Sequence, residues 1–419
     1  MKILVLTQYY PPEGAHIPAT IAEGLAERGH SVRVVTGFPN YPAGRIYPGF
    51  TQRWRDRKRV GSLDVLRVPL WIDHSENPLK RVLNYSSFAV SAATTRRFAK
   101  GADVIYVYAT QMTPALGPWL WRLRGGAPYV LHIQDLWPDS ITGSSLVSAR
   151  AARLIERLLT PWLRSVYRRA SAVIGIAPTM VETLRSRGVD LGRAHLVYNW
   201  AAEDGSVEDL KDRFSLPGKG ARILYGGNVG DLQDLETAIH AAHNARDAGV
   251  RLTIIGDGVA LFRIRALAEE LRVTNVDFLG RVPPADMASF YAASDYALVT
   301  LKDLPAFRGT IPSKLQASLA HGLPIISNVQ GDVRRLVEGA GIGFTADAES
   351  AASLEDAFRR AADATAAQRS EMVERASAQY QGRFSKAAGL IEVEGILRRC
   401  ATEQRSDRVH TKGAPGAGA

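Results

Sequence analysis

Short apolar runs alternate with stretches of helical periodicity along most of the chain, a pattern typical of parallel sheets covered by helices. In the first half the runs predict strands at 2–7, 31–36, 64–68, 103–108, 128–134 and 172–177. In the second half they predict strands at 222–225, 251–255, 276–279, 295–301 and 325–326. The chain has 419 residues, which is long for one domain, so we predict two Rossmann-like α/β domains.

The boundary between these domains is predicted near residue 200, because the following segment, 201–221, has the weakest pattern and is the best linker candidate. The first domain is therefore expected to comprise 1–200 and the second 201–383. A last helix at 384–403 is expected to join the first domain. The end of the chain, 404–419, is rich in Gly and Ala and is expected to be disordered.

One short apolar helix, predicted from Leu315 to Ala320, begins with chemistry suited to an anion. Thr310, Pro312 and Ser313 precede it and are expected to cap its amino end. Backbone N–H groups, the positive end of the helix dipole and the Lys314 ammonium would then point at one spot. A diphosphate is the anion that we expect there. The alternative is an ordinary loop, helix and strand of an α/β domain.

Glycine-rich loops follow several predicted strands of the second domain. Gly226-Gly227-Asn228-Val229-Gly230 follows the first strand, Gly256 the second, and Gly280-Arg281-Val282 the third. Glycine lets a backbone approach a ligand closely. Because the carboxyl ends of parallel strands meet at one edge, these loops and the Lys314 helix are expected to converge on one crevice. The signature G-x-G-x-x-G is absent, so no dinucleotide cofactor is expected.

In the first domain, polar residues gather at the carboxyl end of the predicted strand 128–134. Gln134, Asp135 and Asp139 lie there, and either carboxylate could hold a hydroxyl group of a sugar or of an acceptor. Asp139 could instead cap a helix. His132 lies inside the strand, where a packed histidine is the simpler interpretation.

The positive charge of the protein lies in its first half. Residues 1–200 contain 26 Lys and Arg against 13 Asp and Glu, whereas the remainder contains 26 against 29. Three basic clusters, around 53–59, 80–100 and 157–169, are interleaved with aromatic and aliphatic residues. This combination suits an anionic membrane surface better than a nucleic acid, although solvated arginine-rich helices are the alternative.

Cysteine content and hydropathy indicate the cellular compartment in which the protein is expected. One cysteine, Cys400, excludes internal disulfides and fits a reducing cytoplasm. The start of the chain is expected to be a strand rather than a signal peptide, because Pro11-Pro12 ends a short apolar run. No apolar run approaches the ~20 residues of a transmembrane helix. We therefore expect a cytoplasmic protein, peripheral at most on the inner face of the plasma membrane.

Several motifs together resemble a known enzyme family. They read P-P-E-G, I-Q-D-L-W-P-D, G-G-N-V-G-D-L-Q, V-D-F-L-G-R-V and P-S-K-L-Q-A-S-L-A-H-G-L-P-I-I. They resemble the retaining GT-B glycosyltransferases of family 4, and in particular the bacterial surface-polysaccharide enzymes that include N-acetyl-L-fucosamine transferases. The resemblance implies two Rossmann-like domains that face each other across a cleft. It also implies a UDP-sugar held by the second domain, an acceptor held by the first, and no essential metal or cofactor.

The resemblance implies roles for individual residues. The donor-binding set is Gly14, Gly227, Asn228, Gln233, Gly256, Arg281, Val282, Thr310, Ser313 and Lys314. The acceptor-binding set is His16, Gln134 and Asp139, and the catalytic set is Lys314, Arg308 and Asp135. Asn228 and Gln233 stand where many relatives carry Arg and Lys against the diphosphate. The role of neutralising the diphosphate is therefore assigned to Lys314, Arg308 and the helix dipole, with Lys302 as a further candidate.

The chain also departs from the family pattern. Gly309 and Ala317 stand where relatives carry two glutamates, and Gln134 stands where many carry a histidine. We expect a retaining transferase that moves an N-acetylated hexosamine or deoxyhexosamine from a UDP-sugar to a polyprenyl-linked or other sugar acceptor. The alternatives are a small natural product as the acceptor, a sugar-nucleotide-binding pseudoenzyme, and a GT-B-shaped epimerase. The epimerase is disfavoured because the second half offers no carboxylate or histidine set for proton abstraction.

Overall fold

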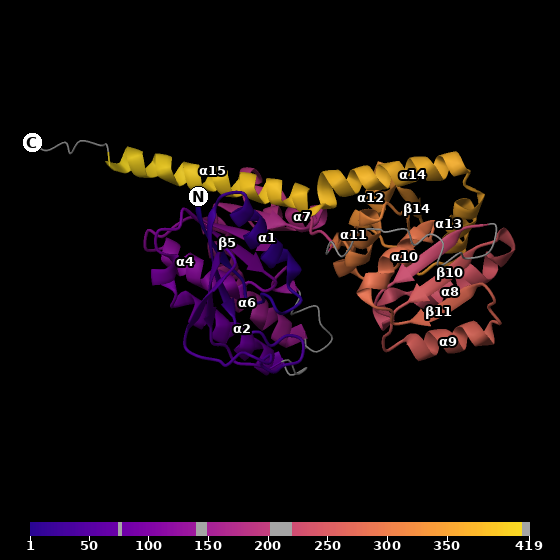
Figure 1. Cartoon of the computed structure of the whole chain (residues 1–419), viewed down its shortest axis with the longest axis horizontal. Helices are drawn as coiled ribbons and strands as arrows, with labels where there is room; N and C mark the ends of the chain where they lie inside the picture. The colour runs from indigo at the N-terminus through magenta and orange to yellow at the C-terminus, as the bar shows by residue number, and fades with distance from the viewer. Residues whose placement is uncertain (74–77, 140–148, 202–219, 413–419) are drawn as a thin grey trace, which may run out of the picture. The chain divides into compact units, whose positions relative to one another are not determined.

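The computed structural model describes residues 1–73, 78–139, 149–201 and 220–412, and the chain divides into two compact units (Figure 1). Unit 1 contains Met1–Ile176, Met180–Val197 and the helical residues from Leu390 onwards. Unit 2 contains Ala177–Thr179 and Tyr198–Gly389.

Unit 1 is built on an eight-stranded sheet with the strand order β3-β4-β2-β1-β5-β6-β7-β8. Its strands are β1 (Lys2–Leu6), β2 (Ser31–Gly37), β3 (Asp56–Val60), β4 (Leu63–Val68), β5 (Val104–Ala109), β6 (Tyr129–Ile133), β7 (Ala172–Gly175) and β8 (Ala194–Leu196). All neighbours pair in parallel except β3 and β4, which form an antiparallel edge. Strands β1, β5 and β6 are almost wholly buried, which explains their continuous apolar sequences.

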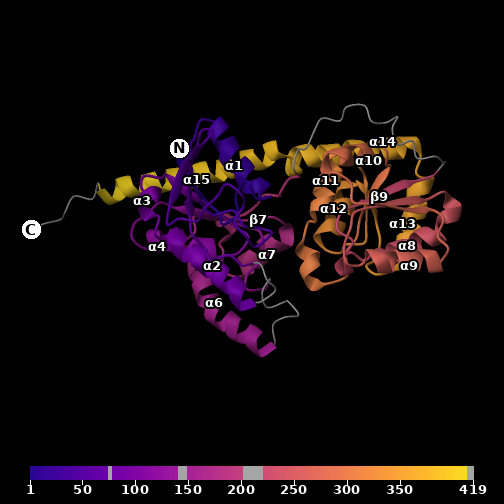
Figure 2. The ribbon, with the colours of Figure 1, turned by 60° about the horizontal axis from the view of Figure 1, so that its bottom comes forward.

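Helices cover the unit 1 sheet on two sides. They are α1 (His16–Glu27), α2 (Pro78–Ala93), α3 (Arg96–Ala99), α4 (Leu116–Arg122), α6 (Ala149–Arg169), α7 (Pro178–Ser186) and α15 (Lys386–Lys412). α15 lies over α1, whose Gly24 approaches so closely that an added Cβ would lie 2.5 Å from Leu390 Cδ1 (Figure 1). Figure 2 shows α2 and α6 on the side of this unit away from α15.

Unit 2 has a six-stranded, all-parallel sheet with the order β11-β10-β9-β12-β13-β14. Its strands are β9 (Arg222–Gly226), β10 (Arg251–Ile255), β11 (Val276–Gly280), β12 (Tyr296–Val299), β13 (Ile325–Ser327) and β14 (Gly343–Thr345). The order reverses between β9 and β12, as in doubly wound folds that bind ligands outside the carboxyl ends of the strands.

The helices of unit 2 bury one face each against this sheet or against one another. They are α8 (Leu235–Asn244), α9 (Leu261–Glu270), α10 (Met287–Ala292), α11 (Ser313–Ala320), α12 (Asp332–Ala340), α13 (Ala351–Asp363) and α14 (Ala366–Gln379). The core contains Tyr225 and Ile254 from strands and Ile239 and Phe358 from helices, each at most 1% exposed. Burial of such apolar surface is the main stabilising contribution to the unit.

The predicted strands are confirmed, and three strands were not predicted. β3 is rich in basic residues and largely exposed, so it lacks the apolar run that marks an inner strand. β8 and β14 have only three residues each. At the end of the chain α15 continues through Lys412, and the rest of the segment 404–419 lies outside the described residues. The predicted linker falls largely on 202–219, which lies outside the described residues.

Candidate functional site

The site begins at the carboxyl ends of β9 and β10, where two glycine loops touch. Gly227 has φ +139° and Gly256 has φ +142°, values that side chains rarely tolerate. A Cβ on Gly256 would lie 1.8 Å from the Gly227 carbonyl oxygen. The first loop also donates two backbone hydrogen bonds to the end of β10 and its loop, from Gly227 N to Ile255 O and from Val229 N to Asp257 O. We call Gly226–Gly230, Gly256–Gly258 and the neighbouring Lys314 the glycine corner.

Lys314 lies on the first turn of α11 and its side chain crosses the glycine corner. A Cβ on Gly227 would lie 2.5 Å from Lys314 Cε, so only glycine leaves room for the lysine stem. The ammonium Nζ lies 4.6 Å from the centroid of the Tyr225 ring. Within the described residues Lys314 has no carboxylate partner, and burial lowers the pKa of its ammonium to about 8. The group is therefore a mostly charged, unneutralised cation at neutral pH, available to an anion.

Asn228 and Gln233 fold the first glycine loop onto itself. Asn228 Nδ2 donates to Gln233 Oε1 at 3.2 Å, and the same oxygen accepts a hydrogen bond from Gly230 N at 3.0 Å. Both side chains are neutral, so they shape the loop without contributing charge. The positive charge of the glycine corner therefore comes from Lys314.

The residues before α11 do not cap it as predicted. The N-cap residue is Pro312, and among the described residues no side chain caps this helix end. Thr310 Oγ1 instead donates to Ala306 O at 3.0 Å, and Ser313 is exposed in the first helical turn. The capping prediction for Thr310 and Ser313 is wrong, because the extended backbone at Pro312 directs the preceding hydroxyl back into its own loop. Leu315 N already donates to Pro312 O at 3.0 Å, so the N–H groups of Ser313 and Lys314, which no side chain caps, are the ones that we assign to a ligand.

Arg308 is already paired. Its Nε and Nη2 donate to the two carboxylate oxygens of Asp303 at 3.0 and 2.8 Å. This exposed bidentate pair neutralises the guanidinium and lowers the pKa of Asp303. Arg308 could act on a diphosphate only if that pair opened. Lys302 lies beside Asp303, and its backbone N–H donates to Leu232 O at 3.0 Å.

Arg281 and Val282 lie after the edge strand β11. Gly256 N donates to Gly280 O at 2.8 Å, which joins this segment to the glycine corner. Arg281 is exposed, whereas Val282 is half-buried. The structure therefore brings together the loops that the sequence predicted to converge after β9, β10 and β11.

A buried polar bridge, which the sequence reasoning missed, holds the other side of the glycine corner. Asn328 Nδ2, after β13, donates to Asp234 Oδ2 at 2.6 Å, and Asn328 Oδ1 accepts from Leu301 N at 3.1 Å. Asp234 Oδ1 also accepts from Thr237 Oγ1 at 2.7 Å. Burial raises the pKa of Asp234, while the two side-chain hydrogen bonds oppose that rise. The bridge fixes the loops at the strand-order reversal.

In unit 1 the predicted residues divide between two places. Gly14 and His16 lie where the loop after β1 enters α1, and a Cβ on Gly14 would meet no atom of the described chain within 4 Å. Gln134 N donates to Ala109 O at 2.9 Å, which sets it beside the end of β5. Asp135 follows, and although its side chain has solvent access, nearby protein raises the pKa of its carboxyl by desolvation.

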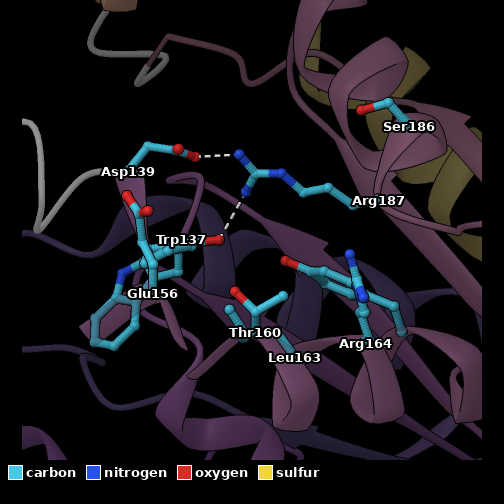
Figure 3. Close-up of a pocket in the computed structure, with 10 residues that line it drawn as sticks. Trp137, Asp139, Glu156, Thr160, Leu163, Arg164, Ser186 and Arg187 are labelled. Atoms are coloured by element: carbon cyan, nitrogen blue, oxygen red, sulfur yellow. Dashed lines mark hydrogen bonds and ion pairs between the residues drawn. The ribbon is translucent and has the colours of Figure 1, made fainter. Parts of the chain in front are cut away.

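Asp139 lines a pocket of about 270 Å³ between α6 and α7. Figure 3 shows Arg187 reaching Asp139, with which it forms an ion pair, and the Trp137 carbonyl oxygen, to which it donates at 2.7 Å. Thr160 and Arg164 come from α6. The carboxylate is therefore held by Arg187, and the pocket offers hydroxyl, carboxylate and aromatic groups of the kinds that bind sugars.

His132 matches the packed interpretation. It is fully buried in β6, its Nδ1 forms a 2.5 Å hydrogen bond with the Tyr106 hydroxyl, and burial lowers the pKa of its imidazole to about 3. It is therefore neutral at ordinary pH and supplies no acid.

Glu13, in the loop after β1, is a buried acidic residue. The residue is 4% exposed, and its carboxylate accepts hydrogen bonds from three backbone N–H groups, those of Tyr10 at 3.1 Å, Asn40 at 2.7 Å and Tyr41 at 2.9 Å. Burial nevertheless raises the pKa of Glu13. The residue ties the loop after β1, which carries Gly14, to the loop after β2.

Comparison with known proteins identifies the chain. Residues 15–200 match the glycosyl transferase 4-like domain and residues 206–379 match the glycosyl transferases group 1. The Escherichia coli K12 protein WcaI, whose name assigns it to colanic acid biosynthesis as a glycosyl transferase, is 30% identical over 377 residues, covering 86% of this chain and 92% of the relative. The chain belongs to this glycosyltransferase family.

Solved structures agree on the fold of the glycosyltransferase. Sucrose-phosphate synthase from Thermosynechococcus elongatus is similar with a TM-score of 0.67 and 16% identity, covering 95% of this chain and 99% of that one. Anabaena HepE in complex with UDP is similar with a TM-score of 0.63 and 17% identity, covering 95% and 100%. The glycosyltransferase therefore has the GT-B fold of two Rossmann-like domains.

No described helix is both long and apolar enough to cross a membrane. No three His, Cys, Asp or Glu side chains of the described residues are grouped so that they could hold a metal ion.

Proposed function

We propose that the chain is a retaining glycosyltransferase that moves an N-acetylated hexosamine or deoxyhexosamine from a UDP-sugar to a polyprenyl-linked or other sugar acceptor in surface-polysaccharide biosynthesis. The observation that carries the proposal is the unneutralised Lys314 ammonium over the glycine corner. The name of WcaI supports polysaccharide biosynthesis, and the UDP in the HepE complex supports a uridine nucleotide.

The proposed reaction breaks the bond between the anomeric carbon and the phosphate oxygen, and its electron pair stays on the diphosphate. The acceptor hydroxyl oxygen bonds to the anomeric carbon on the same face, and its proton passes to the leaving phosphate oxygen. Lys314 and the N–H groups of α11 stabilise the charge that develops there. Loss of one such preorganised group typically raises a barrier by about 3 kcal/mol. Asp135 would hold the acceptor hydroxyl.

The glycine contacts explain why a backbone cradle forms at this point. Gly227 and Gly256 allow the two loops and the stem of Lys314 to pack together, because no side chain stands between them. Backbone N–H groups and a single cation then replace the Arg and Lys that relatives carry, since Asn228 and Gln233 are neutral. The donor-binding and acceptor-binding residues that the family resemblance implies are proposed for this chain. No essential metal or cofactor is proposed.

One observation favours a second candidate, a sugar-nucleotide-binding pseudoenzyme. Gly309 stands at the place of a family glutamate, and a Cβ there would lie 3.0 Å from Thr179 Cγ2. The local packing therefore disfavours a longer side chain, and the chain lacks that sugar contact. Ala317 stands at the place of the second family glutamate, so the contact of that glutamate is also absent.

The experiment is a transfer assay on the full chain. UDP-N-acetylhexosamines, with GDP-sugars as comparison, are incubated with polyprenyl-diphosphate sugars or a small natural-product acceptor, and UDP release and product anomer are measured. We expect a product with retained configuration and at least about tenfold lower kcat/KM for Lys314→Ala. Lys386→Ala, which removes a lysine from α15 and leaves the glycine corner intact, is the matched control. UDP binding without transfer to any acceptor would favour the pseudoenzyme, and sugar conversion without acceptor the epimerase.

The proposal also includes peripheral binding of unit 1 to an anionic membrane on its cytoplasmic side. Leu154 and Leu158 of α6 are 58% and 67% exposed, and the neighbouring Arg157 is also exposed. Val82 and Leu83 of α2 are exposed beside Arg81. Exposed apolar residues flanked by arginines suit an anionic interface. Absence of binding to anionic vesicles at low salt in a flotation assay would count against a lipid acceptor.

A further inference from the structure

Four arginines line one hollow at the amino-terminal edge of the unit 1 sheet. The hollow measures about 400 Å³, and its lining consists of Arg122, Pro128, Arg168, Arg169, Ala170, Ser171, Arg193, Cys400 and Glu403. Pro128 precedes β6, Ser171 precedes β7 and Arg193 precedes β8, so the hollow lies at the edge opposite Gln134 and Asp135. We call it the arginine pocket.

Three arginines of the arginine pocket act on the charge of one neighbouring residue, Tyr129. Burial raises the pKa of the Tyr129 hydroxyl, and the charges of Arg169, Arg122 and Arg193 all act to lower it. The hydroxyl itself donates to Val166 O at 2.6 Å. Arg169, Arg122 and Arg193 are therefore near enough to Tyr129 to act on it electrostatically, although its hydroxyl bonds to the backbone instead.

Positive charge exceeds negative charge in the arginine pocket. Arg193 pairs with Asp190, and its Nη1 donates to the carbonyl oxygens of Arg168 and Ala170 at 2.9 and 3.0 Å. Arg168 and Arg169 are exposed, and neither forms an ion pair with a residue that the structure describes. Among the lining residues only Glu403 is acidic. Arg122 Nη1 donates to Gly126 O at 3.1 Å. The guanidiniums of Arg168 and Arg169 are thus available beside two that the protein holds in place.

We propose that the arginine pocket binds a phosphate group at a site separate from the sugar-nucleotide site of unit 2. The arginine fork matches phosphate oxygens in two-point hydrogen bonds, which distinguishes phosphate from a simple halide. The pocket binds and does not react, since burial raises the pKa of the Cys400 thiol to about 11 and keeps it protonated. The phosphate can belong to an anionic phospholipid headgroup or to a soluble molecule.

The first test is equilibrium dialysis of radiolabelled inorganic phosphate against the full chain with saturating UDP, so that any diphosphate site is occupied. Arg168→Gln/Arg169→Gln should weaken phosphate binding by at least about tenfold. Arg168→Lys/Arg169→Lys should be intermediate, because charge is kept and the fork is lost. Arg360→Gln/Arg375→Gln, which removes two arginines of unit 2 in exposed pairs with Asp356 and Glu371, is the matched control. Equal binding by wild type and the Gln variant, or no binding by wild type, overturns the proposal.

Flotation with phosphatidylglycerol or phosphatidylcholine vesicles then separates the two sources of phosphate. If the Gln variant also loses binding to phosphatidylglycerol vesicles, the ligand is a lipid headgroup. If it loses inorganic phosphate but floats as the wild type does, the ligand is soluble. Neither readout requires sugar transfer, so the proposed function and this site can fail separately. Should the double Gln variant not fold by circular dichroism, the Lys variant and the single changes provide the same comparison.

Discussion

The Nζ atom of Lys314 lies 4.6 Å from the centroid of the Tyr225 ring, and the Lys314 stem passes directly over Gly227. Tyr225 is the last buried side chain of β9, while Lys314 opens α11. The ring gives the ammonium an attractive face without neutralising its charge. The hydroxyl of the same tyrosine donates to Asn228 O at 2.5 Å, so one residue supports both the cation and the glycine loop.

The lowered pKa of Lys314 predicts that binding of a nucleoside diphosphate depends on pH. The ammonium, with a pKa of about 8, is charged below that pH and loses its proton above it. Affinity should therefore be full at pH 7 and fall between pH 8 and pH 9.5, by up to about tenfold per unit. Calorimetry on the wild type, Lys314→Arg and Lys386→Ala checks this. Lys314→Arg should bind without this pH dependence, because arginine stays charged. An arginine variant that still lost affinity above pH 8 would show that another group titrates.

The hydrogen bond between Asn328 and Asp234 predicts that the stability of the variant Asn328→Asp depends on pH. The change sets two carboxylates where Nδ2 and Oδ2 now lie 2.6 Å apart, so one must hold a proton in the folded state. A folded-state pKa raised in this way makes the variant more stable at low pH, and this stability is lost as pH rises. We expect a loss of about 2 kcal/mol or more at pH 8 and a smaller loss at pH 5.

Urea unfolding with hydrogen exchange resolved by unit measures that loss. Asn244→Asp, at the exposed end of α8, introduces the same charge on the surface and should change stability by less than about 0.5 kcal/mol. An equal effect of Asn328→Asp at both pH values would mean that the two carboxylates do not meet.

Residues that follow strands could be placed from the sequence, whereas residues that act through long-range contacts could not. The loops around Gly227, Gly256 and Arg281 were predicted to converge because parallel strands share one carboxyl edge. Asp234 and Asn328 are 94 positions apart, and no local pattern indicates that one donates to the other. The capping prediction for Thr310 failed for a local reason, since Pro312 occupies the cap position with an extended backbone. The pairing of Arg308 with Asp303 was likewise not predicted from the sequence and became visible only in the structure.

Glu13 is predicted to hold the loop that carries Gly14. Glu13→Ala leaves three N–H groups without their acceptor, two of them on the buried residues Tyr10 and Asn40. We expect unit 1 to lose about 2 kcal/mol of unfolding free energy. Glu13→Gln keeps the oxygen that faces Asn40 and Tyr41 and should lose less.

The control for Glu13 is Glu23→Ala, because Glu23 is exposed on α1. Transfer kinetics should show both a lower UDP affinity and a higher acceptor KM for Glu13→Ala, because the loop carries Gly14 of the donor-binding set and His16 of the acceptor-binding set. If UDP affinity fell while acceptor KM stayed constant, the loop would serve the donor rather than the acceptor.

Replacing Gly256 and Gly14 by alanine should affect the stability of the protein very differently. Gly256→Ala sets a Cβ 1.8 Å from the Gly227 carbonyl oxygen at φ +142°, so the glycine corner must deform, and unit 2 should lose at least about 3 kcal/mol. Gly14→Ala meets no atom of the described chain within 4 Å, so its unfolding free energy should change by less than about 0.5 kcal/mol. If Gly14 also approaches the donor diphosphate, Gly14→Ala should lower kcat/KM by about tenfold without loss of stability. Thermal unfolding and UDP release on the same preparations measure both quantities. Full activity of Gly14→Ala would remove Gly14 from the donor site, and a stable Gly256→Ala would show that the two loops are not in contact.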